Sequence, residues 1–179
     1  MNLKKSYVEK YGYEKVITNR NSPLCYAETD MLKLRDGTSA KINEKGKEFA
    51  LIVLNGSITV TGKDFKFEKV GVRKTVFDGV GEAVYVGKDE EFTVTATGGD
   101  AKVCIAKAPA EKHIKAQVIR TADIKTKELG KGAYKRTAAF NVAENAEANL
   151  LYIGEFWAEN GNWASYPPHK HDVDNMPDE

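Results

Sequence analysis

Short apolar runs separated by turn residues make up most of this chain, and no long stretch repeats its apolar positions at the helical spacing. Runs of this length that are rich in β-branched and aromatic residues predict β-strands. The first predicted strands are Leu24 to Ala27, Met31 to Leu34, Phe49 to Leu54, Ser57 to Thr61 and Phe65 to Phe67. Many short strands at fairly even spacing indicate an all-β sandwich or barrel.

The run from Phe49 to Leu54 is apolar throughout, which is typical of a strand that is covered on both faces. Asn55-Gly56 follows it, and Asn-Gly favours the positive φ angles of a type I′ turn. Ser57 to Thr61 then alternates polar and apolar residues, as a half-exposed strand does. The sequence therefore predicts a central strand at Phe49 to Leu54 and a hairpin that pairs it with Ser57 to Thr61.

The same alternation returns later in the chain. Apolar Phe92, Val94 and Ala96 alternate with threonines, and a turn at Gly98-Gly99-Asp100 precedes a second alternating run from Ala101 to Ala106. Residues 1–23 show no sustained strand or helix period, and we interpret them as an arm laid over the core.

A change in composition after Ile119 suggests a domain boundary. Residues 121–132 are rich in charge and glycine and poor in large apolar side chains, which favours a linker. Strands are predicted again at Arg136 to Val142 and Leu150 to Phe156, on either side of an acidic turn. We expect a first domain at 1–119, a linker at 120–135 and a second domain that begins at 136.

Composition narrows the class of protein. The chain has 27 Lys and Arg against 26 Asp and Glu, with no basic cluster, so a nucleic-acid partner is not expected. Its longest apolar run is too short to span a membrane. Two cysteines are too few for a disulfide scaffold, and the first residues lack the apolar stretch of a signal peptide, so we expect a cytoplasmic protein.

Candidate chemistry is concentrated in the last part of the chain. His169 and His171 are two of three histidines, and in an extended strand their imidazoles point to the same face, where they can share a metal ion. Lys170 would point to the other face. The alternative is a polar surface strand with solvated histidines. Residues 1–112 contain no histidine, so we expect the first domain to be structural, and we interpret His113 as a solvated loop residue.

The run from Gly161 to Asp172, Gly-Asn-Trp-Ala-Ser-Tyr-Pro-Pro-His-Lys-His-Asp, closely resembles the metal-site segment of 5-deoxy-glucuronate isomerases, the bicupin enzymes of inositol catabolism. Other segments also look like the first cupin barrel of that family, among them Leu51 to Gly56, Thr75 to Gly79, Ala83 to Val86 and Ala106 to Ala110. The resemblance implies two cupin barrels, of which residues 136–179 begin the second. It also implies an aldose–ketose isomerisation of 5-deoxy-D-glucuronate to 2-deoxy-5-keto-D-gluconate.

The resemblance further implies a divalent metal ion, zinc or manganese, bound by His169 and His171. The general cupin pattern places a glutamate four or five residues later, but Asn175 and Met176 stand there. The family's remaining ligands lie further along the second barrel. We therefore expect residues 1–179 alone to bind metal weakly and to show no turnover.

Trp163 and Tyr166 are candidates to line a sugar pocket, with packing in the core as the alternative. The sequence names no general base. The expected ligand is a small sugar acid, and a homo-oligomer is compatible with the pattern. Two other functions stay open: a related uronate ketol-isomerase of pectin breakdown, and a non-catalytic cupin fragment that acts in packing or binding.

Overall fold

The structure is a computed structural model and describes residues 6–165 of the chain. Strands make up most of its regular structure, and two short 3₁₀ turns are also present. The strands are β1 (Gly12–Ile17), β2 (Glu28–Leu34), β3 (Ser39–Ile42), β4 (Lys47–Asn55), β5 (Ile58–Gly62), β6 (Lys66–Val70), β7 (Ala83–Val86), β8 (Phe92–Ala96), β9 (Ala101–Pro109), β10 (Gln117–Ile119), β11 (Thr126–Leu129), β12 (Arg136–Val142) and β13 (Ile153–Ala158). The 3₁₀ turns are η1 (Thr121–Asp123) and η2 (Gly132–Tyr134).

Two antiparallel sheets form a sandwich from the first ten strands. One sheet has the order β1-β2-β9-β4-β7-β10, and the other has the order β3-β8-β5-β6. Alternate residues of β2, β8 and β9 point inward and are buried, as the alternating sequence predicts. The all-β prediction is confirmed, in the form of a sandwich.

Strand β4 lies inside the larger sheet, between β9 and β7, and is buried on both faces. Phe49, Leu51 and Val53 belong to the apolar cluster between the two sheets of the sandwich. Ala50 and Ile52 point the other way, into a second apolar cluster outside the sandwich. The central, doubly covered strand predicted at Phe49 to Leu54 is therefore confirmed.

The hairpin predicted at Asn55-Gly56 is wrong. Strands β4 and β5 belong to different sheets, so this turn is a corner at which the chain crosses from one sheet to the other. A type I′ turn needs a positive φ at both Asn55 and Gly56. Gly56 has φ +80°, but Asn55 does not have a positive φ, because Lys69 and Asp89 are the non-glycine residues within 6–165 that do. A Cβ on Gly56 would lie 2.3 Å from the Asp100 carbonyl oxygen, so the corner requires glycine.

Two predictions before residue 28 are also wrong. Residues 12–17, interpreted as an arm, form the edge strand β1, which pairs antiparallel with β2. The run Leu24 to Ala27 is a bend, and its Leu24 and Tyr26 side chains are 44% and 69% exposed. It follows Pro23, and with its side chains in solvent it has no apolar face to bury in a sheet.

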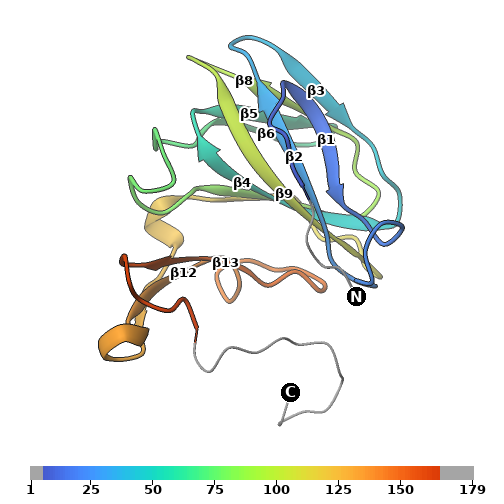
Figure 1. The fold of residues 1–179 in the computed structure, drawn as a ribbon. Coiled ribbons are helices and arrows are strands. Elements are labelled where there is room, and N and C mark those ends of the chain that lie inside the picture. The colour runs from blue at the N-terminus through green and yellow to red at the C-terminus, as the bar shows by residue number, and fades with distance from the viewer. Residues whose placement is uncertain (1–5, 166–179) are drawn as a thin grey trace.

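A third sheet, of order β11-β12-β13, packs against the outer face of the larger sheet. Figure 1 shows β12 and β13 below the sandwich. The strand predicted at Arg136 to Val142 is confirmed with those bounds, and the next begins at Ile153. The expected linker at 120–135 contains β11 and both 3₁₀ turns, and its Ile124 is buried in the second apolar cluster. The division into domains stays a prediction.

No helix in residues 6–165 is both long and apolar enough to cross a membrane.

Candidate functional site

The third sheet is the part of the described structure nearest in sequence to the predicted metal site. Strand β13 ends at Ala158, and the chain then turns back toward η2. There the backbone N–H of Trp163 donates to the Ala133 carbonyl oxygen at 2.8 Å. The Trp163 side chain is 52% exposed and belongs to neither apolar cluster. Tyr166, His169 and His171 lie outside the described residues. Their roles, and that of Trp163, stay predictions.

A cavity of about 290 Å³ with polar lining residues opens on this sheet, beside the last residues of strand β13. Trp157 forms one wall, and its indole N–H donates to the Val76 carbonyl at 2.9 Å. Side chains of both charges line the rest: Glu128, Lys135, Arg136 and Glu159, together with Thr137. Sequence reasoning missed this cavity because its residues come from three segments without a shared motif.

The other face of the third sheet carries aromatic side chains. Phe140 contacts the rings of Tyr152 and Phe156 in edge-to-face geometry, at centroid distances of 5.7 and 6.5 Å. Tyr152 and Phe156 remain 58% and 52% exposed. Partial desolvation, the charge of Glu144 and the hydrogen bond to Glu144 raise the pKa of Tyr152, so its hydroxyl stays protonated and donates a hydrogen bond to Glu144 at 3.2 Å.

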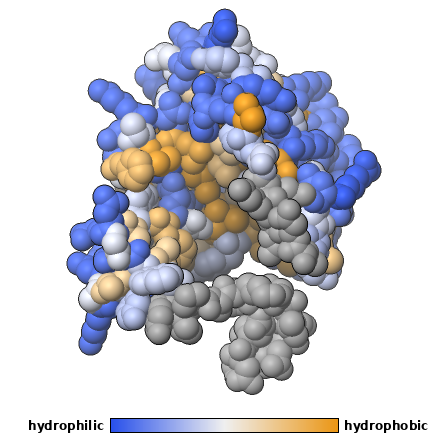
Figure 2. Space-filling model, viewed as in Figure 1, coloured by the Kyte–Doolittle hydropathy of each residue, from blue (hydrophilic) through white to orange (hydrophobic). Residues whose placement is uncertain are grey.

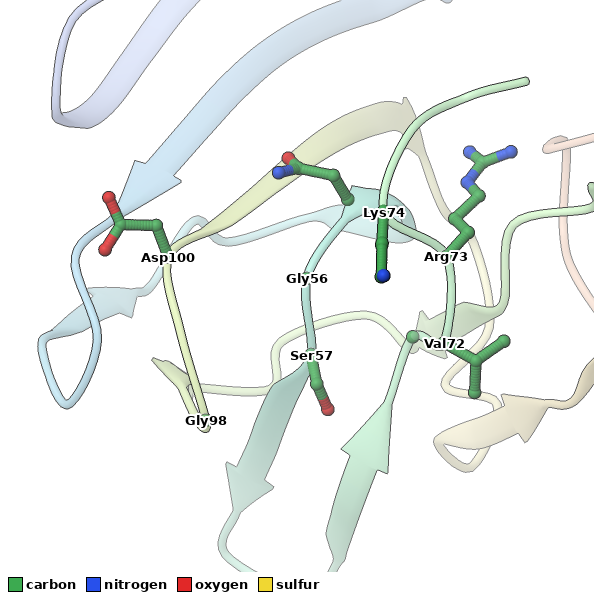
Figure 3. Close-up of a pocket in the computed structure, with 9 residues that line it drawn as sticks. Gly56, Ser57, Val72, Arg73, Lys74, Gly98 and Asp100 are labelled. Atoms are coloured by element: carbon green, nitrogen blue, oxygen red, sulfur yellow. The ribbon is translucent and has the colours of Figure 1, made fainter. Parts of the chain in front are cut away.

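A cavity of about 320 Å³ lies at the loop end of the sandwich, where the corner at Gly56 meets the loops after β6 and β8. In Figure 3 the Lys74 side chain extends along this opening, and the Arg73 guanidinium points away from Gly56 and Ser57. Asp100 is engaged elsewhere, because it accepts hydrogen bonds from the Tyr11 hydroxyl and the Asp36 N–H. One lysine beside an open loop surface does not by itself define a ligand.

The interior of the sandwich holds an ionic cluster at one end. Lys107 is fully buried, and its Nζ lies 2.5 Å from Asp30 Oδ2, 3.3 Å from Glu28 Oε2 and 3.2 Å from Glu44 Oε1. Burial by itself would lower the pKa of Lys107, but its contacts with Asp30 and Glu44 outweigh burial and raise it. The ammonium is therefore held in its charged form and neutralises carboxylates that would otherwise be buried without a counter-ion.

Glu44 lies at the edge of this ionic cluster, and its side chain is 17% exposed. Burial would raise its pKa, but hydrogen bonds and charge from Lys15, Lys107 and Lys47 lower it to about 2. The Tyr13 hydroxyl donates to Asp30 and also contacts Glu44 at 3.2 Å. Burial and these carboxylates raise the pKa of Tyr13. No periodic pattern reveals such a cluster, because its members are brought together by four different segments.

His113 lies at the surface, as predicted. Its side chain is 52% exposed, Nδ1 lies 2.9 Å from the Lys88 carbonyl oxygen, and Nε2 lies 3.6 Å from Glu90 Oε1. Within residues 6–165 no three or more His, Cys, Asp or Glu side chains are grouped so that they could hold a metal ion.

The sandwich and the third sheet are joined by an apolar interface that carries two buried acidic contacts. Figure 2 shows apolar residues gathered between the sandwich and the lower sheet, with hydrophilic residues around them. Within this interface Glu48 is fully buried, and Arg73 has a side chain that is 1% exposed and pairs with Glu155 at 2.6 Å. The position of the third sheet is thus defined by directional contacts as well as by apolar packing.

Residues 3–179 match the KduI/IolB family model. The chain is 37% identical over 166 residues to the 5-deoxy-glucuronate isomerase of Bacillus subtilis (strain 168), an alignment that covers 91% of this chain and 60% of that protein. It is 31% identical to the protein of the same name from Listeria monocytogenes, with the same two coverages. The chain thus spans about 60% of the length of these relatives.

A solved structure gives the same fold. The crystal structure of an IolB-like protein from Salmonella typhimurium LT2 superimposes with a TM-score of 0.86 at 24% sequence identity, and the match covers 94% of this chain and 64% of that one. At this identity the similarity supports the fold, including the placement of the third sheet beside the sandwich.

Proposed function

Since the chain belongs to the KduI/IolB family, we propose that it acts as a 5-deoxy-glucuronate isomerase of myo-inositol catabolism. The proposed reaction interconverts 5-deoxy-D-glucuronate and 2-deoxy-5-keto-D-gluconate. The observation that carries the proposal is the 37% identity to a 5-deoxy-glucuronate isomerase over 91% of the chain. Because the chain spans about 60% of that relative, the activity of the whole relative is transferred here as a proposal.

The proposed metal ligands are His169 and His171. Their i, i+2 spacing supports this assignment, because it places both imidazoles on one face of an extended strand. A bound divalent ion, zinc or manganese, would supply Lewis-acid polarisation of the sugar carbonyl. Trp163 and Tyr166 are proposed to contact the sugar, and the half-exposed Trp163 is available to do so. We name no general base.

A small sugar acid is the proposed ligand, and metabolism of such a compound fits a cytoplasmic enzyme. The near balance of 27 basic and 26 acidic residues supports the proposal that nucleic acid is not a partner. The exposed aromatic rings of Tyr152 and Phe156 are compatible with a homo-oligomer.

The test is an isomerase assay on the product of the natural gene. We expect turnover of 5-deoxy-D-glucuronate, and we expect His169→Ala and His171→Ala each to lower kcat/KM by about 100-fold or more. Lys170→Ala is the matched control, since its side chain should point to the opposite face, and it should change kcat/KM by less than about threefold.

Two results would count against the proposal. Turnover that survives in both histidine variants would show that His169 and His171 are not the metal ligands. Turnover of a pectin-derived uronate in place of 5-deoxy-D-glucuronate would assign the chain to the related uronate ketol-isomerases.

A further inference from the structure

The Glu48 carboxylate is enclosed between the sandwich and the third sheet, and it connects the two. It lies on the outer face of β4 and has no solvent exposure. Its Oε1 accepts the N–H groups of Leu150 and Leu151 at 2.6 and 2.9 Å. Its Oε2 accepts the Asn149 N–H and the Tyr85 hydroxyl, both at 2.7 Å. Glu48, a residue of the sandwich, therefore accepts hydrogen bonds from three consecutive backbone N–H groups in the turn that leads into β13.

Successive backbone N–H groups that converge in a turn form an anion-binding concavity. In this protein the anion is internal, because the Glu48 carboxylate occupies the concavity made by residues 149–151. Hydrogen bonds to an ionised carboxylate are about twice as strong as neutral ones. Burial and the hydrogen bond to Glu48 raise the pKa of Tyr85, so its hydroxyl stays protonated and remains a donor. The turn is thus held by a charge-assisted set of contacts.

Arg73 makes a second contact of this kind, on β13 itself. Its Nη2 lies 2.6 Å from Glu155 Oε1, and its Nη1 lies 3.3 Å from Glu155 Oε2. The guanidinium is fixed in turn by the carbonyl oxygens of Val53 at 3.1 Å and Gly79 at 2.8 Å. The two-pronged geometry sets both the position and the orientation of the Glu155 side chain.

Apolar packing between the two bodies is not directional, since it depends mainly on the area removed from water. The Glu48 and Arg73 contacts are directional, and each would leave a buried charge without its partner if β13 shifted along the sandwich. They therefore favour one placement of β13 along the sandwich, which apolar packing alone does not specify.

We propose that Glu48 and Arg73 are positioning residues, which hold the turn at 149–151 and strand β13 in one orientation from which the chain runs on toward His169 and His171. The sandwich then contributes to the reaction by fixing strand β13, which precedes the proposed ligands His169 and His171 in the chain. This inference rests on the proposed function for the site that is positioned, but the contacts themselves do not.

Chemical rescue tests the role of the Glu48 carboxylate. In Glu48→Ala we expect the amides of 149–151 and 153–158 to exchange hydrogen at least about 30 times faster, while the amides of β2 and β9 change by less than about threefold. Formate at about 0.1 M should restore the protection of 149–151, because it can occupy the same concavity. Arg73→Gln should also accelerate exchange in 153–158, but formate should not restore it, since a cation has been lost.

The functional measurement is Mn²⁺ binding to the natural gene product by calorimetry. We expect Glu48→Ala to weaken Mn²⁺ binding by about 10-fold, with recovery in formate. Glu91→Ala is the matched control, because Glu91 is an exposed carboxylate that pairs with Lys41, and it should change neither measurement. If Glu48→Ala does not fold, Glu48→Gln gives the same comparison of exchange rates with one acceptor oxygen replaced by a donor.

The inference is overturned if residues 149–158 keep their protection in Glu48→Ala, or if every strand exchanges faster to the same extent and formate restores none of them. Unchanged Mn²⁺ affinity with faster exchange at 149–158 would also overturn it. If the unaltered protein binds no Mn²⁺ and turns over no sugar acid, the proposed function fails, and the exchange data still decide whether Glu48 and Arg73 position β13.

Discussion

Individual residues of the ionic cluster give the sandwich a dependence on pH. Glu44 has a pKa of about 2 in the folded protein, below its ordinary value of 4.5, because Lys15, Lys107 and Lys47 outweigh the effect of burial. A lowered pKa means that Glu44 stabilises the fold fully above about pH 4.5, and that this contribution is lost as the pH falls toward 2.

Glu44→Gln should therefore lower the free energy of unfolding at pH 6 by about 1 to 2 kcal/mol, allowing for solvent screening. At about pH 2 the difference should shrink to a few tenths of a kcal/mol, because Glu44 is then protonated in the unfolded state and about half protonated in the folded protein. Urea unfolding at the two pH values measures the difference. Glu68→Gln, which removes an exposed carboxylate paired with Lys66, should have little effect at either pH. A loss of stability in Glu44→Gln that is equal at both pH values would contradict this assignment.

Gly56 offers a second test at the scale of one residue. Gly56→Ala adds a Cβ to a residue with φ +80° and places it 2.3 Å from the Asp100 carbonyl oxygen. Gly37→Ala is the matched control, since Gly37 has φ +72° but no atom within 4 Å of the added Cβ. We expect Gly37→Ala to cost about 1 kcal/mol of unfolding free energy and Gly56→Ala to cost about 2 kcal/mol more. Equal losses in urea unfolding would show that the corner adjusts to the side chain.

Strand β4 allows a comparison at the scale of one element. Leu51 lies in the cluster inside the sandwich, and its neighbour Ile52 lies in the cluster between the sandwich and the third sheet. Leu51→Ala should destabilise the whole sandwich by about 2 to 5 kcal/mol, because it leaves a cavity in a closed core. Ile52→Ala should instead accelerate hydrogen exchange mainly in β12 and β13. The prediction fails if both variants accelerate exchange in the same strands.

The elements also show what the sequence could predict. Arg136 to Val142 was predicted with its observed bounds, and β4, β8 and β9 follow their apolar patterns, because each of these strands buries a regular set of side chains. The edge strand β1 was missed, since its residues are only partly buried and carry no such pattern. Asn55-Gly56 was correctly predicted as a turn, but local turn chemistry does not distinguish a hairpin from a corner between sheets.

The candidate site was harder to predict than the fold. The contact between Glu48 and residues 149–151 joins positions about 100 residues apart, so no spacing in the sequence reveals it. The i, i+2 pair of histidines was visible because both members lie on one short segment. The cavity beside Trp157 falls between these cases, since a tryptophan near charged residues is noticeable but its partners are not adjacent in sequence.

At the scale of the whole molecule, we expect the metal ligands to come from the segment after residue 165 and not from the sandwich. In the natural gene product, His169→Ala combined with His171→Ala should reduce bound zinc or manganese to background in elemental analysis. The urea midpoint of the sandwich should change little, because the buried residues described between its two sheets come from strands β2 to β9. Stoichiometric metal in the double variant would mean that the sandwich, or another part of the protein, holds the ion.

The double burial of β4 also bears on how this sequence can diverge over evolution. Leu51 is paired with Ile105 within its own sheet, whereas Ile52 shares a cluster with Ala139 and Val142 of the third sheet. Substitutions at adjacent positions of one strand should then covary with different parts of the chain. Nearly every side chain of β4 packs against another residue, so few of its positions can be substituted independently. We therefore expect β4 to accumulate substitutions more slowly than the edge strands of either sheet.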